Sequence, residues 1–267
     1  MVRATLRRCT AAACSLLVIS ALAAGLAGAE QGGSPGVRVS LDGNFSPKQL
    51  LRDRFSPVSI TLKGSVQGTE GRLPPPIGRI DIDFGKNASL TTTGLPTCRR
   101  SQLVASNLNR AMSACGPALV GRGEVTAILE FPDGVPSEVH AHLLAFNGRS
   151  KEPDAVVWAL VAPYRPALAT SFVLPFYLQG IPTGSFGHRI RAPVYDNPTS
   201  FWRLKEFSVT LGRRYHHQGE RRSYLDARCP LPPRFNSLSI PLARATYRFA
   251  PSPAITVGIY RSCRVRD

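Results

Sequence analysis

The sequence predicts an all-β protein: an antiparallel β-sandwich, Ig-like or jelly-roll, with one short disulfide-bracketed helix near residues 97–114. From Val37 onward, apolar and polar residues alternate with a period of two in one run after another. Turn residues such as Asn147-Gly148 separate these runs at short intervals. Only one segment has helical spacing instead. Many short strands with such spacing are typical of a sandwich.

The chain begins with a segment typical of an export signal. Arg3, Arg7 and Arg8 form a basic start, residues 11–26 are uncharged, and Ala27-Gly28-Ala29 fits a cleavage site. An uncleaved membrane anchor is the alternative interpretation of this run. With cleavage after residue 29, we expect a secreted or envelope-associated protein with a flexible leader over residues 30–36. We expect no transmembrane span in the mature chain.

Twelve strands are expected after the leader, and turn or proline-rich segments separate them. They are Val37–Leu41, Val58–Val66, Arg79–Phe84, Gly123–Phe131, Val139–Phe146, Ala155–Val161, Thr170–Leu178, His188–Tyr195, Lys205–Leu211, Ser223–Arg228, Ala243–Phe249 and Ile255–Arg261. Apolar and polar residues alternate over residues 79–84, so one face of this strand should be buried and the other exposed to solvent. Residues 156–161 are apolar throughout, as in a central strand. We expect a single domain over 37–267, with two small domains split near 151–153 or 196–199 as the alternative.

The helical segment runs from Thr97, a plausible N-cap, to Ala114, and Gly116-Pro117 ends it. Its apolar residues follow a helical stripe. They are Leu103, Val104, Leu108, Ala111 and Met112.

Four cysteines remain after removal of residues 1–29: Cys98, Cys115, Cys229 and Cys263. An even number in an exported chain predicts two disulfides, for which three pairings exist. The favoured pairing is Cys98–Cys115 with Cys229–Cys263, because each pair brackets a coherent segment. No C-x-x-C spacing is present, which disfavours a zinc site.

Three segments resemble a group of exported actinobacterial proteins of unassigned function. They are Leu95-Pro96-Thr97-Cys98, the stretch from Ala114 to Gly121 (ACGPALVG) and Ser262-Cys263. The resemblance rests on structural residues. It implies a secreted β protein with disulfides, and it implies no activity and no site.

The chain is strongly basic, and the excess is concentrated near its end. The formal charge is +16, and residues 1–29 hold three arginines and no acid, which leaves +13. Residues 203–267 carry 13 basic and 4 acidic side chains. Such a lopsided field favours polyanionic neighbours. The expected partners are an anionic cell-envelope polymer or lipid head groups, with no specific nucleic acid.

The most basic stretch reads as a hairpin tip between strands ending at Leu211 and beginning at Ser223. Its candidate binding residues are Arg213, Arg214, Tyr215, Arg221 and Arg222. Arginines contact phosphates, and an aromatic ring among them can stack on a ligand. A solvated, mobile loop is the alternative interpretation.

Three weaker candidates involve other chemistry. Glu138, His140 and His142 share one strand face, where further ligands would allow a metal site, although a solvated face is favoured. Asp81 and Asp83 share a face at about 7 Å, within the range of a glycosidase acid pair, although an outward polar face is favoured. Several aromatic residues are candidates to line a sugar or lipid groove, although most should be core. They are Phe172, Phe176, Tyr177, Phe201 and Trp202.

The function predicted from these patterns is that of a non-enzymatic, exported envelope or extracellular protein whose basic C-terminal third associates with an anionic surface. The alternative is a secreted carbohydrate-active or other hydrolytic enzyme on a jelly-roll scaffold. A partner-binding module is a third possibility. No P-loop or dinucleotide-binding fingerprint occurs, so no cofactor is expected.

Overall fold

The computed structural model describes residues 29–104, 107–130, 135–148, 155–165, 171–194, 202–249 and 253–266. Nearly all of the predicted export signal, the two suggested domain boundaries and Phe201 lie outside these ranges. The described strands are β1 Glu30–Ser34, β2 Val37–Ser46, β3 Gln49–Leu50, β4 Ser56–Pro57, β5 Ser59–Gly68, β6 Ile77–Gly85, β7 Ala88–Leu90, β8 Leu119–Glu130, β9 Pro136–Asn147, β10 Ala155–Pro163, β11 Phe172–Gly180, β12 Phe186–Pro193, β13 Trp202–Leu211, β14 Arg214–His217, β15 Glu220–Ser223, β16 Leu225–Ala227, β17 Ser237–Phe249 and β18 Ile255–Val265. The helices are α1 Arg100–Leu103, α2 Leu108–Cys115 and the 3₁₀ turn η1 Gly116–Ala118.

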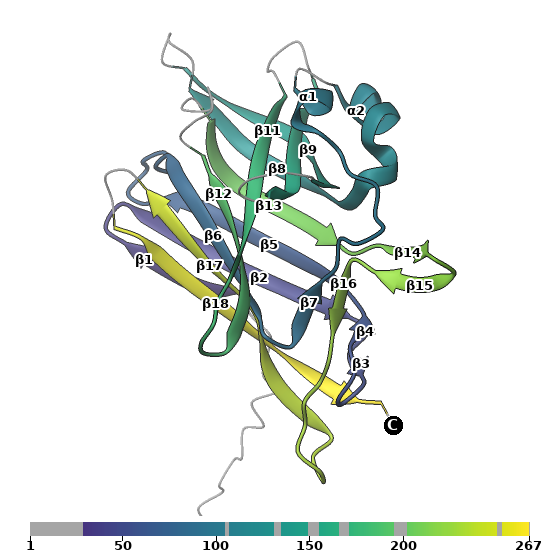
Figure 1. Ribbon diagram of the computed structural model, residues 1–267. Helices are drawn as coiled ribbons and strands as arrows, with labels where there is room; N and C mark the ends of the chain where they lie inside the picture. Colours follow the sequence, from purple (N-terminus) through teal and green to yellow (C-terminus); the bar gives the residue numbers. More distant parts are fainter. Residues whose placement is uncertain are drawn as a thin grey trace, which may run out of the picture.

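Thirteen of these strands form one mixed sheet, in the order β1-β2-β5-β13-β8-β9-β10-β11-β12-β6-β17-β18-β3. All neighbouring pairs are antiparallel except β18 with β3. The sheet curls like a half-barrel, so that β18, near one end of the order, packs against β1 and β2 at the other (Figure 1). At this approach a β-carbon on Gly32 would lie 2.8 Å from Cγ1 of Val257, which only glycine avoids.

The main hydrophobic core fills the space between the two facing parts of the curled sheet. Leu41 and Ile60 come from one part, and Tyr247 and Ile259 come from the other; none is more than 1% exposed. Their strands alternate buried and exposed residues, as the period of two predicts.

The mostly-β prediction is confirmed, and each expected strand overlaps an observed one, with Phe131, Thr170 and Tyr195 outside the described residues. The strands do not form the two separate sheets of a sandwich, because the middle strands β8 to β11 connect both parts through continuous hydrogen-bonded pairing. Strands on either side of both suggested domain boundaries belong to this one sheet, and the single domain stays a prediction.

The expected flexible leader is instead a strand over most of its length. β1 pairs with β2 from Glu30↔Leu41 to Ser34↔Val37, and Gly36 takes a positive φ of 88° in the turn between them. The glycine-rich composition that suggested flexibility serves close packing, because Gly32 lies against β18.

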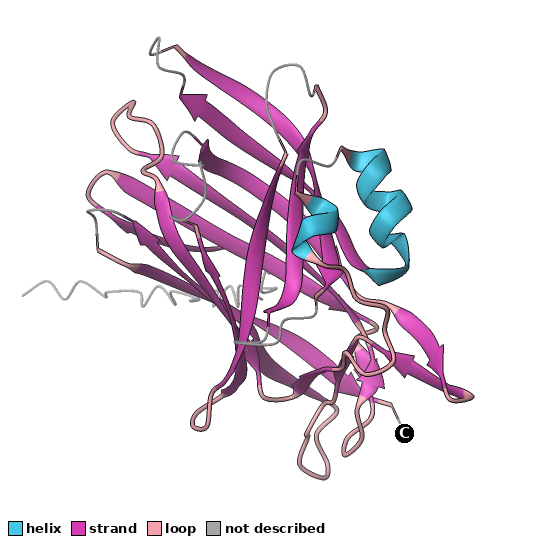
Figure 2. Ribbon diagram, turned by 45° about the horizontal axis from the view of Figure 1, so that its top comes forward, coloured by secondary structure: helices cyan, strands magenta, loops and turns pink. Residues whose placement is uncertain are grey.

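The helical segment near residues 97–114 forms two short helices, α1 and α2, rather than one (Figure 2). Asn107 accepts a hydrogen bond from the backbone N–H of Arg110 at 2.9 Å and thereby starts the second helix. Val104, expected in the apolar stripe, is 52% exposed where the first helix ends. Leu103 and Ala111 are buried as expected.

Both predicted disulfides are confirmed: Cys98–Cys115 and Cys229–Cys263. The first links the base of the helical pair, and all four cysteines are buried. Disulfides persist in oxidising compartments, so the pairs indicate an oxidising, extracytoplasmic environment for the chain.

Strand β10 is apolar on both faces because one face packs against the helices and the other lines the pocket. Trp158, Leu160 and Ala162 lie under the helices in a second hydrophobic cluster. Val157, Ala159 and Val161 point to the concave side of the sheet. Residues 156–161 are therefore apolar throughout because β10 separates the helices on one face from the pocket on the other.

Candidate functional site

An apolar pocket of about 170 Å³ lies on the concave side of the curled sheet. The 22 described residues that line it are all hydrophobic, and none of them is charged. They are Leu62, Ile77, Ile80, Ile82, Phe84, Val125, Ala127, Leu143, Ala145, Val157, Ala159, Val161, Phe172, Leu174, Phe176, Ile190, Val194, Trp202, Leu204, Phe207, Val209 and Leu211. An apolar cavity of about 150 Å³ is large enough to admit benzene.

The space arises from a row of small residues across three neighbouring strands. Gly121 of β8 lies opposite Ala145 of β9, and Ala145 lies opposite Ala159 of β10. Leu211 and Leu174 continue this row on β13 and β11. Directly opposed residues point to the same face, so Ala145 and Ala159 form a floor beside the larger Leu174, while the side chain of Leu211 lies over Gly121.

An aromatic pair narrows the pocket across the concave side. The rings of Phe172 and Trp202 meet edge to face, with centroids 4.9 Å apart. Their strands, β11 and β13, are separated in the sheet by β8, β9 and β10. The contact therefore spans the bend rather than joining neighbouring strands, and both rings remain half-buried.

A smaller cavity adjoins the pocket, and strands β7 and β16 of the small sheet β4-β16-β7 help to line it. Tyr224 and Leu225 line a cavity of about 20 Å³ that shares Phe84 and Ile190 with the main pocket. The hydroxyl of Tyr224 is buried without a hydrogen-bond partner among the described residues. Burial raises the pKa of Tyr224, so this group is a neutral phenol at physiological pH.

Of the aromatic residues predicted to line a groove, Phe172, Phe176 and Trp202 do line the pocket. Tyr177 packs instead against the cluster under the helices, on the outer face of the sheet. The aliphatic majority of the described lining was not predicted, and its residues come mainly from eight strands. Alternation on each strand was the available signal, and it gives no information about which strands meet.

The predicted basic hairpin exists as β14 and β15, but its side chains are not equivalent. Arg213 donates to the backbone carbonyls of Pro117 and Leu119. Arg222 pairs with Glu220 at 3.0 Å. Arg214 and Arg221 are exposed.

The ring of Tyr215 is half-buried, and its hydroxyl donates to the carbonyl of Thr93 at 2.7 Å. Tyr215 thus helps to tie the hairpin to the body of the protein. The role of the hairpin in binding stays a prediction that now rests mainly on Arg214 and Arg221.

Glu138, His140 and His142 lie on the convex face of β9, away from the pocket. Glu138 is paired with Lys205 at 2.6 Å, and this hydrogen bond lowers the pKa of the Glu138 carboxyl. The described residues contain no group of three His, Cys, Asp or Glu side chains placed to hold a metal ion. The geometry therefore gives the metal alternative no support.

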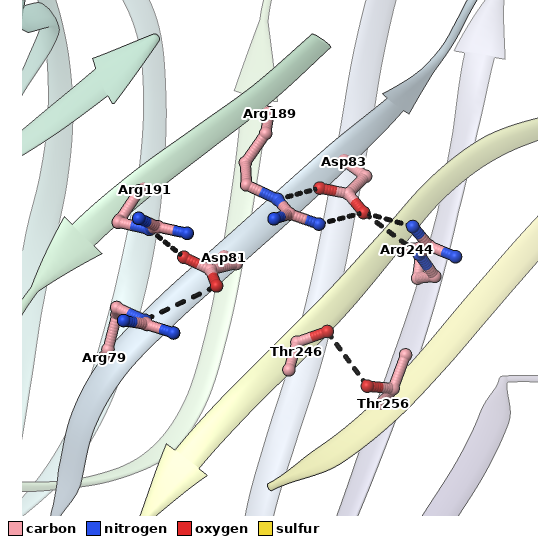
Figure 3. Close-up of polar contacts among 8 residues, drawn as sticks. All are labelled: Arg79, Asp81, Asp83, Arg189, Arg191, Arg244, Thr246 and Thr256. Atoms are coloured by element: carbon pink, nitrogen blue, oxygen red, sulfur yellow. Dashed lines mark hydrogen bonds and ion pairs between the residues drawn. The ribbon is translucent and has the colours of Figure 1, made fainter. Parts of the chain in front are cut away.

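Asp81 and Asp83 also face the convex side, but they are buried beneath arginines rather than wet (Figure 3). Arg189 and Arg244 both donate to Asp83, with the shortest contacts at 2.6 Å. Asp81 accepts from Nε of Arg191 at 2.7 Å.

Burial alone would raise the pKa of Asp83, but hydrogen bonds from Arg189 and Arg244 and their charges outweigh it and lower this pKa. A glycosidase acid must hold a proton near neutral pH. The Asp83 carboxyl is ionised there, which argues against an acid pair with Asp81.

Comparisons with protein-family models, with curated proteins and with solved structures found no match for this chain. In the described part of the chain, no helix has the length and apolar character needed to cross a membrane.

Proposed function

We propose that this protein is an exported, non-enzymatic binding protein for a hydrocarbon chain, such as the acyl chain of a lipid. The observation that carries the proposal is the pocket, since the 22 described residues of its lining are all hydrophobic. Binding sites for small molecules are concave and mostly apolar, and a few polar groups give them specificity. The described part of the lining holds no charged side chain, which fits the apolar part of a ligand.

The physical reason for binding is the apolar surface that the fold leaves accessible. Half of the lining residues, including Phe172, Leu174, Trp202 and Phe207, are only partly buried. Transferring apolar surface out of water is favourable by roughly 25 cal/mol per Å². A hydrocarbon segment in the pocket would remove both its own surface and that of the lining from water.

Catalysis has less support in the described structure. Among the described residues of the lining there is no nucleophile, acid or base. The acid candidates of the hydrolase alternative, Asp81 and Asp83, lie on the opposite face and are held by arginines. Localisation in the envelope or the medium remains part of the proposal and is supported by the two disulfides.

Ligand binding can be followed through Trp202, because the chain has only two tryptophans and Trp158 lies on the other face. In a Trp158→Phe background, a fatty acid brominated in mid-chain is expected to quench Trp202 fluorescence saturably. Ala159→Leu in that background places a larger side chain on the pocket floor, and we expect at least tenfold weaker binding. Its stability should be unchanged or up to about 1 kcal/mol higher, since it fills space.

Ala162→Leu is the matched control, because Ala162 lies on the same strand but faces the helices. We expect it to keep ligand affinity and to lose about 1–3 kcal/mol of stability through overpacking. Absence of saturable quenching in the parent, or equal affinity in the Ala159→Leu variant, would contradict the proposed function.

A further inference from the structure

Five arginines gather on the convex side of β12, β6 and β17, behind one wall of the pocket. Cross-strand pairing places them in rows: Arg189–Asp83–Arg244, Arg191–Asp81–Thr246 and Pro193–Arg79–Arg248. We call Arg79, Arg189, Arg191, Arg244 and Arg248 the arginine face. Ile80, Ile82 and Ile190, which alternate with these residues along the strands, line the pocket on the other side of the sheet.

The two carboxylates contact four of the five arginines and do not neutralise the arginine face. Asp83 accepts from Nε and Nη2 of both Arg189 and Arg244 (Figure 3). A guanidinium has five N–H groups, so these contacts use two of the five on each arginine. Five guanidinium groups over two carboxylates carry a net charge of +3, and the side chains of Asp81 and Asp83 are only 3% and 2% exposed.

One pair within the arginine face is unfavourable in the protein alone. Arg79 and Arg248 are directly opposite each other on adjacent strands, where like charges destabilise a sheet. Nε of Arg79 is buried without a hydrogen-bond partner among the described residues, and it lies 3.4 Å from Oδ2 of Asp81 in an ion pair only. An external anion over this pair would relieve the repulsion.

An exposed aromatic side chain lies beside the arginine face. Thr256, Gly258 and Tyr260 alternate with buried residues along β18, and Thr256 bonds to Thr246 of the second row at 2.9 Å. The side chain of Tyr260 is 53% exposed. Tyrosine is enriched where proteins meet the membrane–water interface, since its ring and its hydroxyl prefer different surroundings.

We propose that the arginine face docks the protein on an anionic lipid bilayer, with the guanidinium groups on lipid phosphates and Tyr260 at the head-group level. Arginine matches phosphate geometry, and positions fixed by Asp81 and Asp83 reduce the entropy lost on binding. The inference deepens the proposed function, because a bilayer is a source of acyl chains for the pocket.

The test is co-sedimentation with phosphatidylglycerol/phosphatidylcholine vesicles at low salt, with pure phosphatidylcholine vesicles as the neutral comparison. Each arginine near an anionic surface contributes roughly a fivefold increase in partitioning. We therefore expect the double variant Arg79→Gln/Arg248→Gln to bind about 25-fold more weakly than the parent. This variant leaves Asp83 with both of its arginines and Asp81 with Arg191, so the fold should be kept.

The matched control is Arg214→Gln/Arg221→Gln, which removes the same charge from the exposed positions of the hairpin. We expect less than about a threefold loss from it. An equal or larger loss would assign the docking to the hairpin or to net charge alone, and would overturn the inference. Equal binding to neutral vesicles, or equally tight binding to duplex DNA, would also overturn it.

Docking through the arginine face and ligand binding in the pocket can be tested separately. Arg79→Gln/Arg248→Gln, in the Trp158→Phe background, should keep the quenching of Trp202 by the soluble brominated fatty acid. Ala159→Leu should keep binding to anionic vesicles. Loss of vesicle binding in Ala159→Leu would show that docking depends on the pocket, and would contradict the assignment to the arginine face.

Discussion

Replacing Cys229 and Cys263 together by alanine is expected to lower the free energy of unfolding by about 4 kcal/mol. The bond closes a separation of 34 residues, and without it the unfolded chain gains conformational freedom. The bond joins the segment after β16 to β18, the strand that packs against β1 and β2. The midpoint of thermal unfolding should fall by roughly 8–16 °C, measured by circular dichroism.

The pair Cys98 and Cys115 provides the comparison. Their bond closes a separation of 17 residues, so the same double replacement should cost about 3 kcal/mol and affect mainly α1 and α2. We expect urea unfolding to rank the two variants in this order. Loss of less than 1 kcal/mol in the Cys229/Cys263 variant would contradict the role assigned to that bond.

Both disulfides could be predicted because each closes a local unit. Cys98 and Cys115 enclose the helical pair, and Cys229 and Cys263 enclose the loop and strands that form the β17–β18 hairpin. Spacing along the chain carries this information. The break between α1 and α2 was not predicted, because the apolar stripe suggested one helix while Asn107 caps a second.

The curl of the sheet could not be predicted from the same patterns. Alternation shows which side chains share a face, but it does not show which faces meet. Residues 156–161 fit the centre of a sandwich as well as they fit a wall between helices and a pocket. The close approach of β1 to β18 depends on Gly32, whose sequence context is typical of a flexible segment.

The candidate site was predictable only in its aromatic part. Phe172, Phe176 and Trp202 were identified by residue type. The floor of Ala145 and Ala159 exists only through pairing between β9 and β10, and small residues give no local signal of a cavity. Long-range register therefore determines the pocket.

Charge along the chain was likewise a poor guide to charge on the surface. The hairpin has the densest basic sequence, yet Arg213 is bound to backbone carbonyls and Arg222 to Glu220. The arginine face draws residues from three strands far apart in sequence. Strand pairing in the sheet, and not closeness in sequence, brings the charges of the arginine face together.

Asp83 holds Arg189 and Arg244 of the arginine face in place, and Asp83→Asn is expected to lower the free energy of unfolding by about 3 kcal/mol. Removing one partner of a buried ion pair leaves the others without compensation and typically costs 3–5 kcal/mol. We expect the lower end of this range of destabilisation because the side chains of Arg189 and Arg244 remain 29% and 37% exposed. Asp81→Asn should cost less, since among the described residues one guanidinium, that of Arg191, donates a hydrogen bond to Asp81.

The same carboxylate should make stability depend on acid pH. The pKa of Asp83 is lower in the folded protein than in the unfolded chain, so the ionised group stabilises the fold above the unfolded value near 3.8. This contribution should be lost as the pH falls below that value and through the folded pKa. Chemical unfolding between pH 6 and pH 2 should therefore show a steeper acid loss in the parent than in Asp83→Asn. Parallel curves for the two proteins would contradict the assignment, because they would show that the arginines do not depress the pKa of this carboxylate.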